Sequence, residues 1–227
     1  MSIASADPDP NIAYYETRAD RFFAETAGVD MTPLRDRFLA HLAPRATILD
    51  AGCGSGRDAR AFRELGYPVT AMEPSPRLAA LAETYCGLPV ERLRFQNLDW
   101  HQRFDGIWAC ASLLHVPVAE LPDALQRLAR SLRPKGVLYA SFKYGHGERD
   151  SGGRRFTDLD EAALADLLHW VPELTTIETW VTADQRAGRE AERWLNVLLA
   201  NDRRDIAGSM VDQAGADSDH GAGSSSA

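Results

Sequence analysis

A glycine-rich segment at residues 50–56 is the part of this chain best suited to ligand chemistry. Its sequence is Asp50-Ala51-Gly52-Cys53-Gly54-Ser55-Gly56, between an apolar stretch typical of a β-strand and a stretch typical of a helix. Glycines at such a turn permit a positive φ, and they let a ligand lie on the backbone where a Cβ would collide with it. The segment therefore predicts a site for a nucleoside-like ligand.

The glycine spacing distinguishes between nucleotide cofactors. The dinucleotide fingerprint G-x-G-x-x-G places a pyrophosphate at the N-terminus of the following helix. Here Gly52, Gly54 and Gly56 follow the pattern G-x-G-x-G instead. Asp50 at the strand end is also a poor neighbour for a pyrophosphate and a good one for an ammonium or sulfonium group. The segment disfavours a dinucleotide and favours a ligand that carries a positive charge.

A second carboxylate follows the next predicted strand. Glu73 lies 73 − 52 = 21 positions after Gly52 and is followed by Pro74. A spacing of about 20 residues is expected for the carboxylate that accepts hydrogen bonds from the ribose hydroxyls of a nucleotide. Glu73 is therefore predicted to hold a ribose, in preference to being a solvated loop residue.

The D-x-G-x-G-x-G segment resembles motif I of the class I S-adenosylmethionine (SAM)-dependent methyltransferases. The resemblance covers roughly residues 12–200 and includes Glu73, Asp99 and the strand at 104–107. A finer resemblance, carried by residues 108–115 and 142–145, is to small bacterial tellurite-resistance-type and small-molecule methyltransferases. The Asn-Pro-Pro-Tyr-type signature of nucleic-acid amino-methyltransferases is missing after the fourth predicted strand.

The resemblance implies SAM as cofactor, S-adenosylhomocysteine as product, and roles for further residues. Asp99 would accept the adenine amino group, which is a hydrogen-bond donor, with Trp100 or Leu98 packed on the ring. One of Tyr14 and Tyr15 would close over the cofactor, the alternative being core packing. Arg57, and less favourably Arg18, would meet its carboxylate. The predicted cofactor-binding residues are Tyr14, Tyr15, Asp50, Gly52, Cys53, Gly54, Gly56, Arg57, Glu73, Pro74, Asp99, Trp100, Ala111 and Ser112.

Two residues are candidates for a catalytic role. The small residues Ala111 and Ser112 end the fourth predicted strand and leave room for the methionine part of the cofactor, and His115 follows them. Imidazole changes charge near neutral pH, so His115 either acts as a base toward an acceptor hydroxyl or amine or lines the cofactor site. Tyr144 is the second candidate, in the loops near 144–155. No covalent enzyme nucleophile is required, because methyl transfer needs mainly alignment and exclusion of water.

The predicted function is direct methyl transfer from SAM to an oxygen, nitrogen or sulfur atom of a small molecule. Three alternatives remain open. The first is a SAM-binding enzyme of non-methylating chemistry, and the second is a nicotinamide-dependent oxidoreductase, which the glycine spacing disfavours. The third is a non-catalytic SAM-binding module.

Composition limits the partners and the location. The 227 residues include 33 acidic and 25 basic ones, for a net charge of −8, and no Lys/Arg-rich block occurs, so a nucleic-acid partner is disfavoured. Cys53, Cys86 and Cys110 form no C-x-x-C pair and no His cluster accompanies them, which favours a reduced, cytoplasmic protein without a metal site. No apolar run is long enough to span a bilayer. The oligomeric state stays open.

Alternating strand and helix patterns predict an α/β fold with a doubly wound, mostly parallel seven-stranded sheet, helices on both faces and an antiparallel end. The chain divides into a flexible N-terminus (1–11), a methyltransferase domain (12–204) that begins with a helical lid (12–44), and a disordered tail (205–227). Gly145-His146-Gly147 is read as a loop, and Asp158-x-x-Glu161 as the cap of a helix that ends at His169. The predicted strands are 47–51, 69–72, 93–95, 104–111, 137–142, 175–182 and 194–199.

Overall fold

The computed structural model describes residues 9–186 and 188–203. The predicted tail (205–227) and residues 1–8 of the predicted flexible N-terminus lie outside the described residues. Residues 9–11 differ from that prediction because they begin helix α1 (Pro10–Thr26). The Asp9 carboxylate accepts a hydrogen bond from Asn11 N, and Pro10 occupies the first helical turn, where its missing N–H costs nothing.

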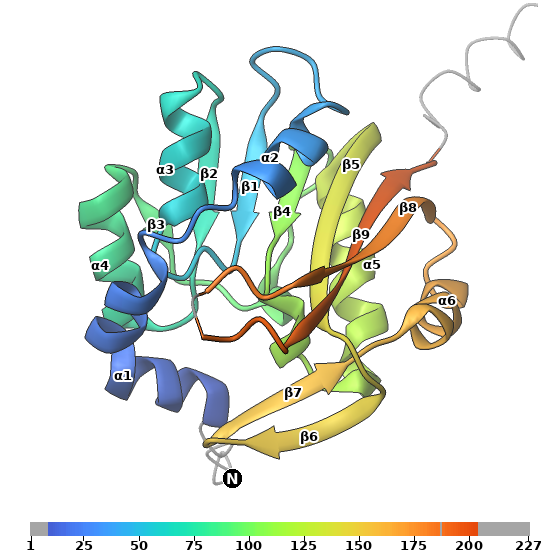
Figure 1. Cartoon of the computed structure of the whole chain (residues 1–227). Coiled ribbons are helices and arrows are strands. Elements are labelled where there is room, and N and C mark those ends of the chain that lie inside the picture. Colours follow the sequence, from blue (N-terminus) through green and yellow to red (C-terminus); the bar gives the residue numbers. More distant parts are fainter. Residues whose placement is uncertain (1–8, 187, 204–227) are drawn as a thin grey trace, which may run out of the picture.

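A seven-stranded sheet forms the centre of the molecule (Figure 1). Its strand order is β3-β2-β1-β4-β5-β9-β8. The pairs from β3 to β5 are parallel, whereas β9 is antiparallel to both of its neighbours. This confirms the predicted fold class, including the antiparallel end. The strands are β1 (Ile48–Ala51), β2 (Val69–Met72), β3 (Val90–Glu91), β4 (Phe104–Ala109), β5 (Leu132–Lys143), β8 (Leu174–Ala183) and β9 (Arg193–Asn201).

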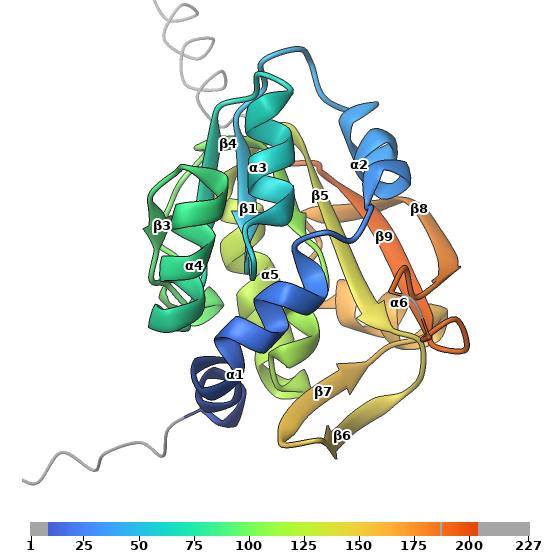
Figure 2. The same cartoon turned by 60° about the vertical axis from the view of Figure 1, so that its left-hand side comes forward.

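Helices cover both faces of the sheet (Figure 2). On one face, Phe38 and Phe62 from the helices before and after β1 pack against Trp108 and Tyr139, all fully buried. On the other face, leucines of the two last helices pack against β4, β5 and β9. No helix among the described residues is both long and apolar enough to cross a membrane. The remaining helices are α2 (Thr32–Leu39), α3 (Arg57–Glu64), α4 (Pro76–Cys86), α5 (Leu121–Ser131) and α6 (Glu161–His169).

The third strand lies earlier than predicted. The prediction places it at 93–95, but β3 is Val90–Glu91, and Phe95–Asn97 form a short 3-10 helix, η1. Gly87 ends α4 in a left-handed conformation, so the chain reaches the sheet edge within three residues. Phe95 packs in the hydrophobic core beneath the sheet, which accounts for an apolar residue at a position outside any strand.

A β-hairpin occupies the region read from sequence as a loop. Strands β6 (Gly147–Ser151) and β7 (Arg154–Asp158) pair antiparallel at the lower end of the molecule in Figure 1. Asp158 therefore ends β7 and pairs with Arg149, and it does not cap a helix. The cap of α6 is Asp160, whose carboxylate accepts from Ala163 N at 2.8 Å, so the predicted Asp158-x-x-Glu161 cap is wrong.

The Phe38→Ala variant tests the aromatic core beneath β1 and β4. Phe38 is fully buried, with its ring centroid 5.4 Å from that of Trp108 and 5.8 Å from that of Phe62. We expect the truncation to lower the free energy of unfolding by about 3–5 kcal/mol, measured by urea denaturation. Leu65→Ala is the control, because Leu65 is 61% exposed; equal losses in the two variants would contradict this packing.

Candidate functional site

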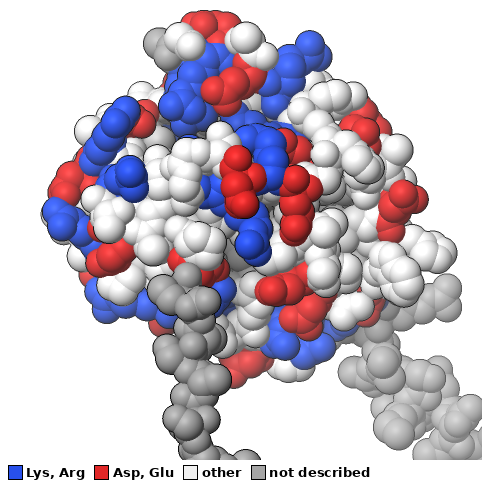
Figure 3. Space-filling view, turned by 90° about the horizontal axis from the view of Figure 1, so that it is seen from below, with Lys and Arg blue, Asp and Glu red and all other residues white. Residues whose placement is uncertain are grey.

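Two adjoining cavities open where the parallel strands end. The larger cavity has a volume of about 610 Å³ and lies between the glycine-rich segment, the β6–β7 hairpin and the β8–β9 connection. The smaller cavity, about 90 Å³, lies between the ends of β1, β2 and β4 and the start of α1. Figure 3 looks onto this end of the molecule and shows acidic and basic side chains interspersed. Six residues line both cavities and define a junction, namely Tyr15, Phe22, Gly52, Gly54, Ala111 and His115.

The glycine-rich segment is shaped by protein contacts as well as by backbone conformation. Gly52, Gly54 and Gly56 all have positive φ, at 80°, 55° and 77°. A Cβ on Gly52 would lie 2.5 Å from the Cβ of Ser112, so glycine lets the ends of β1 and β4 meet. The Ser112 hydroxyl closes this contact by donating to Ala51 O at 2.6 Å. The contact with Ser112 therefore requires glycine at position 52, whether or not a ligand is bound.

Glu73 is a buried carboxylate at the wall of the smaller cavity. Its two oxygens accept from Ser75 N at 3.0 Å and from Gly54 N at 3.2 Å. Burial raises the pKa of Glu73 to about 7, since these two donors offset only part of the desolvation. A carboxylate has about four acceptor sites, so lone pairs remain for hydroxyl donors from a ligand. Pro74 lines the same cavity.

The structure does not bring Asp99 and Trp100 to either cavity. Asp99 is exposed, and Trp100 packs on Phe104 in a T-shaped pair. Leu98, the other residue proposed against an adenine ring, is buried in the core. Because β3 ends at Glu91, the residues that reach the smaller cavity from this connection lie earlier in the chain, at Leu93, Arg94, Phe95 and Gln96. A predicted third strand at residues 90–91 would have put these four residues just after the strand end, where ligands bind in such a sheet.

A charged cluster lies beneath the glycine-rich segment. Asp58 is buried and receives bonds from Arg57, from Arg35 at 2.8 Å and from the indole of Trp108 at 3.0 Å. Although burial opposes its ionisation, the two guanidinium groups hold the pKa of Asp58 below its usual value. Arg35 also reaches the exposed carboxylate of Asp30 at 4.0 Å, and Arg57 lines the larger cavity.

Asp50 adds a buried acid to the same wall. Its Oδ2 atom is buried without a hydrogen-bond partner, and the residue lines the larger cavity. Burial, and next the negative charge of Asp58, raise the pKa of Asp50 well above its ordinary value. An unsatisfied buried carboxyl oxygen is costly in a protein interior. A donor or cation supplied by a ligand would satisfy it.

His115 is neutral and has both ring nitrogens occupied. Its Nδ1 lies 3.0 Å from Arg155 O, which can only accept, so Nδ1 carries the proton. Its Nε2 lies 2.7 Å from the Tyr15 hydroxyl and accepts from it. Burial lowers the pKa of His115 to about 4 and raises that of Tyr15. This geometry favours a lining and positioning role for His115 over a free base.

The other predicted aromatic and basic residues divide between the site and its surroundings. Tyr15 lines the junction, whereas Tyr14 lines neither cavity and stacks with Arg18 and Arg154. Arg18 is exposed and stays outside the site. Tyr144 lines the larger cavity at its exposed rim, where its hydroxyl donates to Glu161 at 2.9 Å.

The structure places all but four of the predicted cofactor-binding residues against a cavity. The four outside are Tyr14, Gly56, Asp99 and Trp100. Gly56 begins α3 in a left-handed conformation and faces Ala82, so it shapes the segment from behind. Cys53 and Ala111 line the larger cavity, and Ala111 holds a positive φ of 53° with its N–H donating to Ser141 Oγ. This non-glycine strain lies at the junction.

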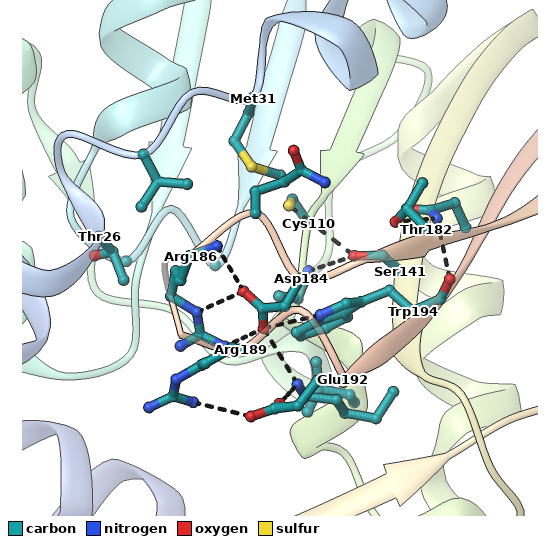
Figure 4. A pocket seen from close by; sticks show the side chains of 18 of the residues that line it. Thr26, Met31, Cys110, Ser141, Thr182, Asp184, Arg186, Arg189, Glu192 and Trp194 are labelled. Atoms are coloured by element: carbon teal, nitrogen blue, oxygen red, sulfur yellow. Dashed lines mark hydrogen bonds and ion pairs between the residues drawn. The ribbon is translucent and has the colours of Figure 1, made fainter.

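The β8–β9 connection builds a wall of the larger cavity that the sequence did not predict (Figure 4). Asp184 is buried and accepts from Arg186 and from the indole of Trp194 at 3.0 Å. Burial alone would raise the pKa of Asp184, but the hydrogen bonds and positive charge of Arg186 hold that pKa below its ordinary value. Lys143 from β5 joins the cluster through ion pairs to Asp184 and Glu192. The charge density of residues 184–193 was the only signal in the sequence.

The raised pKa of Glu73 predicts a pH-dependent stability. The pKa of about 7 in the folded protein exceeds the unfolded value of about 4.3, so the folded state binds more protons between these limits. The contribution of Glu73 to the free energy of unfolding therefore falls as the pH rises through this window. We expect the difference between wild type and Glu73→Gln to fall by ~3 kcal/mol from pH 4 to pH 8, measured by denaturant titration. Parallel pH profiles would contradict the raised pKa.

The chain matches known proteins over most of its length. Residues 23–194 match a family model described as "Methyltransferase domain". A curated relative, the malonyl-[acyl-carrier protein] O-methyltransferase of Enterobacter lignolyticus (strain SCF1), is 34% identical over 111 residues, covering 45% of this chain and 42% of the relative. The chain thus spans less than half of the length of this curated relative.

Two solved structures extend the comparison. The Burkholderia thailandensis 1,6-didemethyltoxoflavin-N1-methyltransferase, with bound 1,6-didemethyltoxoflavin and S-adenosylhomocysteine, has a TM-score of 0.67 and 26% identity over 89% of this chain and 94% of that one. The [4+2]-cyclase SpnF has a TM-score of 0.63 at 16% identity over 88% and 98% of the two chains, a likeness of fold alone. These findings confirm the family and the cofactor predicted from motif I. The chain belongs to the methyltransferase-domain family of the class I SAM-dependent superfamily.

Proposed function

We propose that this protein transfers a methyl group from SAM to an oxygen, nitrogen or sulfur atom of a small-molecule acceptor by direct displacement. One observation carries the proposal. A buried carboxylate suited to ribose hydroxyls, Glu73, lines a small cavity that joins a much larger one through the glycine-rich segment. The two cavities supply separate places for a nucleoside and for an acceptor.

The residues present fit SAM at each of its polar ends. The smaller cavity suits adenosine, with Glu73 for the ribose and Phe95 and Gln96 for the base. The unpartnered oxygen of Asp50 suits the ammonium group, and the guanidinium of Arg57, which lines the larger cavity, suits the carboxylate. When bound, SAM supplies a methyl group made electrophilic by the sulfonium.

The side chains at the junction position and shield the acceptor. The hydrogen bond between Tyr15 and His115 fixes both rings, and Asn11 ties α1 to the same place by donating to His115 O at 3.1 Å. We propose that α1 and α2 form the lid expected for residues 12–44, since α1 contributes Tyr15 and Phe22 to both cavities. Exclusion of water and alignment are the main contributions that displacement requires. Tyr144 at the rim would contact the acceptor as it enters.

The comparisons support a small-molecule acceptor. The 1,6-didemethyltoxoflavin-N1-methyltransferase neighbour has the small molecule 1,6-didemethyltoxoflavin bound, and the net charge of −8 of this chain disfavours nucleic acid. A cytoplasmic location remains our proposal, supported by Cys53, Cys86 and Cys110, which are all free thiols.

A SAM-binding enzyme of non-methylating chemistry is the second candidate function. The fold shared with a [4+2]-cyclase favours it, because that fold occurs with another reaction. A non-catalytic SAM-binding module has no observation in its favour. A nicotinamide-dependent oxidoreductase is disfavoured further, since Asp50 lies at the segment where a pyrophosphate would bind.

Substitutions at Gln96 and Asp99 separate the two possible adenine contacts. Gln96 lines the smaller cavity and Asp99 does not. We expect Gln96→Ala to weaken S-adenosylhomocysteine binding roughly tenfold, the loss of one to two hydrogen bonds, and Asp99→Ala to change the Kd less than about twofold. Isothermal titration calorimetry measures both. The opposite ranking would restore Asp99 as the adenine ligand.

Binding and product analysis together test the proposed function. The full chain should bind SAM and S-adenosylhomocysteine in calorimetry, and Glu73→Ala should weaken both, because the ribose hydroxyls lose their acceptor. Incubation with methyl-labelled SAM and a pool of small-molecule acceptors should then yield a labelled product with release of S-adenosylhomocysteine. A folded wild type that binds neither ligand contradicts the proposal. Product formation without gain of a methyl group favours the non-methylating alternative.

A further inference from the structure

Arg154 is an unusual cation in the larger cavity. It lies at the start of β7, is half-buried, and lines the cavity next to the junction. Its Nη1 donates to the Tyr15 hydroxyl at 3.3 Å, and its guanidinium stacks 4.6 Å from the Tyr14 ring centroid and 4.9 Å from that of Phe156. Its Nε atom is buried and has no hydrogen-bond partner. No carboxylate of the described residues pairs with it.

The positive charges of the other Arg and Lys side chains that line this cavity are neutralised by carboxylates or exposed to water. Each is paired with a carboxylate of the protein except Arg193, and Arg193 is exposed to water. The pairs are Arg57 with Asp58, Lys143 with Asp184 and Glu192, Arg149 with Asp158, Arg186 with Asp184, and Arg189 with Glu192. Arg154 is therefore the one partly buried lining cation, among the described residues, whose charge no protein group neutralises.

An unneutralised guanidinium in such a place is costly. Taking a charge out of water without an opposite charge is unfavourable, and each buried N–H without an acceptor adds to the cost. The aromatic rings and the Tyr15 hydroxyl stabilise the guanidinium in part, but none of them carries a negative charge, because Tyr15 and His115 form a neutral pair. The missing anion must therefore come from a ligand, and a planar fork of donors fits an oxyanion.

We propose that the acceptor carries an anionic group, a carboxylate or a comparable oxyanion, which binds to Arg154 at the junction side of the larger cavity. This inference rests on the proposed function and names the acceptor class that the function leaves open. The carboxylate of the cofactor is the other possible source of the anion. Arg154 lines only the larger cavity and lies on the hairpin, whereas Arg57 follows the glycine-rich segment directly and is the nearer cation for the cofactor carboxylate.

A matched pair of probes tests this acceptor class. 2-Naphthoate and 2-naphthamide have nearly the same size and differ in charge. Each is titrated by calorimetry into the full chain saturated with S-adenosylhomocysteine. We expect the wild type to bind the naphthoate at least about tenfold more tightly, as one charge-assisted contact provides. Arg154→Met should abolish that preference, and Arg154→Gln, which retains a donor toward Tyr15, should do the same if the Met variant does not fold.

Arg193→Met is the matched control. It removes the same formal charge from the wall of the same cavity, at an exposed residue without a carboxylate partner. The naphthoate preference should persist in this variant within about twofold, since exposed charges are screened by water and salt. Equal loss in Arg193→Met and Arg154→Met would show a general field effect and overturn the specific contact.

The remaining outcomes separate the sources of the anion. Equal affinity of the wild type for both probes, no naphthoate binding at millimolar concentration, or a preference that survives in Arg154→Met and Arg154→Gln overturns the inference. A loss of S-adenosylhomocysteine affinity in Arg154→Met, with unchanged affinity for 5′-methylthioadenosine, assigns the contact to the cofactor carboxylate and also overturns it. If the wild type does not bind S-adenosylhomocysteine at all, the proposed function itself fails.

Discussion

The close contact between the ends of β1 and β4 is the constraint on which the site depends. Parallel pairing brings Ala51 and the residues after Ala109 to the same edge of the sheet, and the hydroxyl of Ser112 bonds to Ala51 O at 2.6 Å. Only glycine at position 52 allows this distance. The contact sets the smaller cavity on one side and the larger cavity on the other, with Gly52 in the wall of both.

Several charged or polar groups at the two cavities lack a partner within the protein, and a bound ligand would supply one. Burial leaves Asp50 with an unpartnered oxygen and raises the pKa of Glu73 to about 7, while Arg154 has no protein anion. Each arrangement is unfavourable in the protein alone and becomes favourable when a donor, a hydroxyl or an anion arrives. In contrast, both ring nitrogens of His115 already have hydrogen-bond partners, one of them the Tyr15 hydroxyl. This pair is therefore better suited to positioning a ligand than to transferring a proton.

The sequence predicts those parts of the site that local patterns determine. The glycine spacing and the distance to Glu73 are encoded within two consecutive strand–turn–helix units, so their positions at the cavities follow from the fold class. Asp99 lies outside both cavities because the apolar residues after β3 pack in the core, and periodicity over so short a segment does not distinguish a strand from a buried turn. Arg154 reaches the site on the β6–β7 hairpin, and Asp184 reaches it on the β8–β9 connection. No local sequence pattern links these two residues to the distant glycine-rich segment or to Glu73.

A crystal structure of the protein with S-adenosylhomocysteine would show which residues hold each part of the cofactor. We expect the ribose hydroxyls on Glu73, the base beside Gln96, and the sulfur at the junction formed around Gly52 and Tyr15. We also expect the methionine end of the cofactor to lie against Asp50 and Arg57 and to leave Arg154 free, with the rest of the larger cavity open for the acceptor. A cofactor bound elsewhere, or one whose carboxylate occupies Arg154, would contradict the assignment of Arg154 and the space around it to the acceptor.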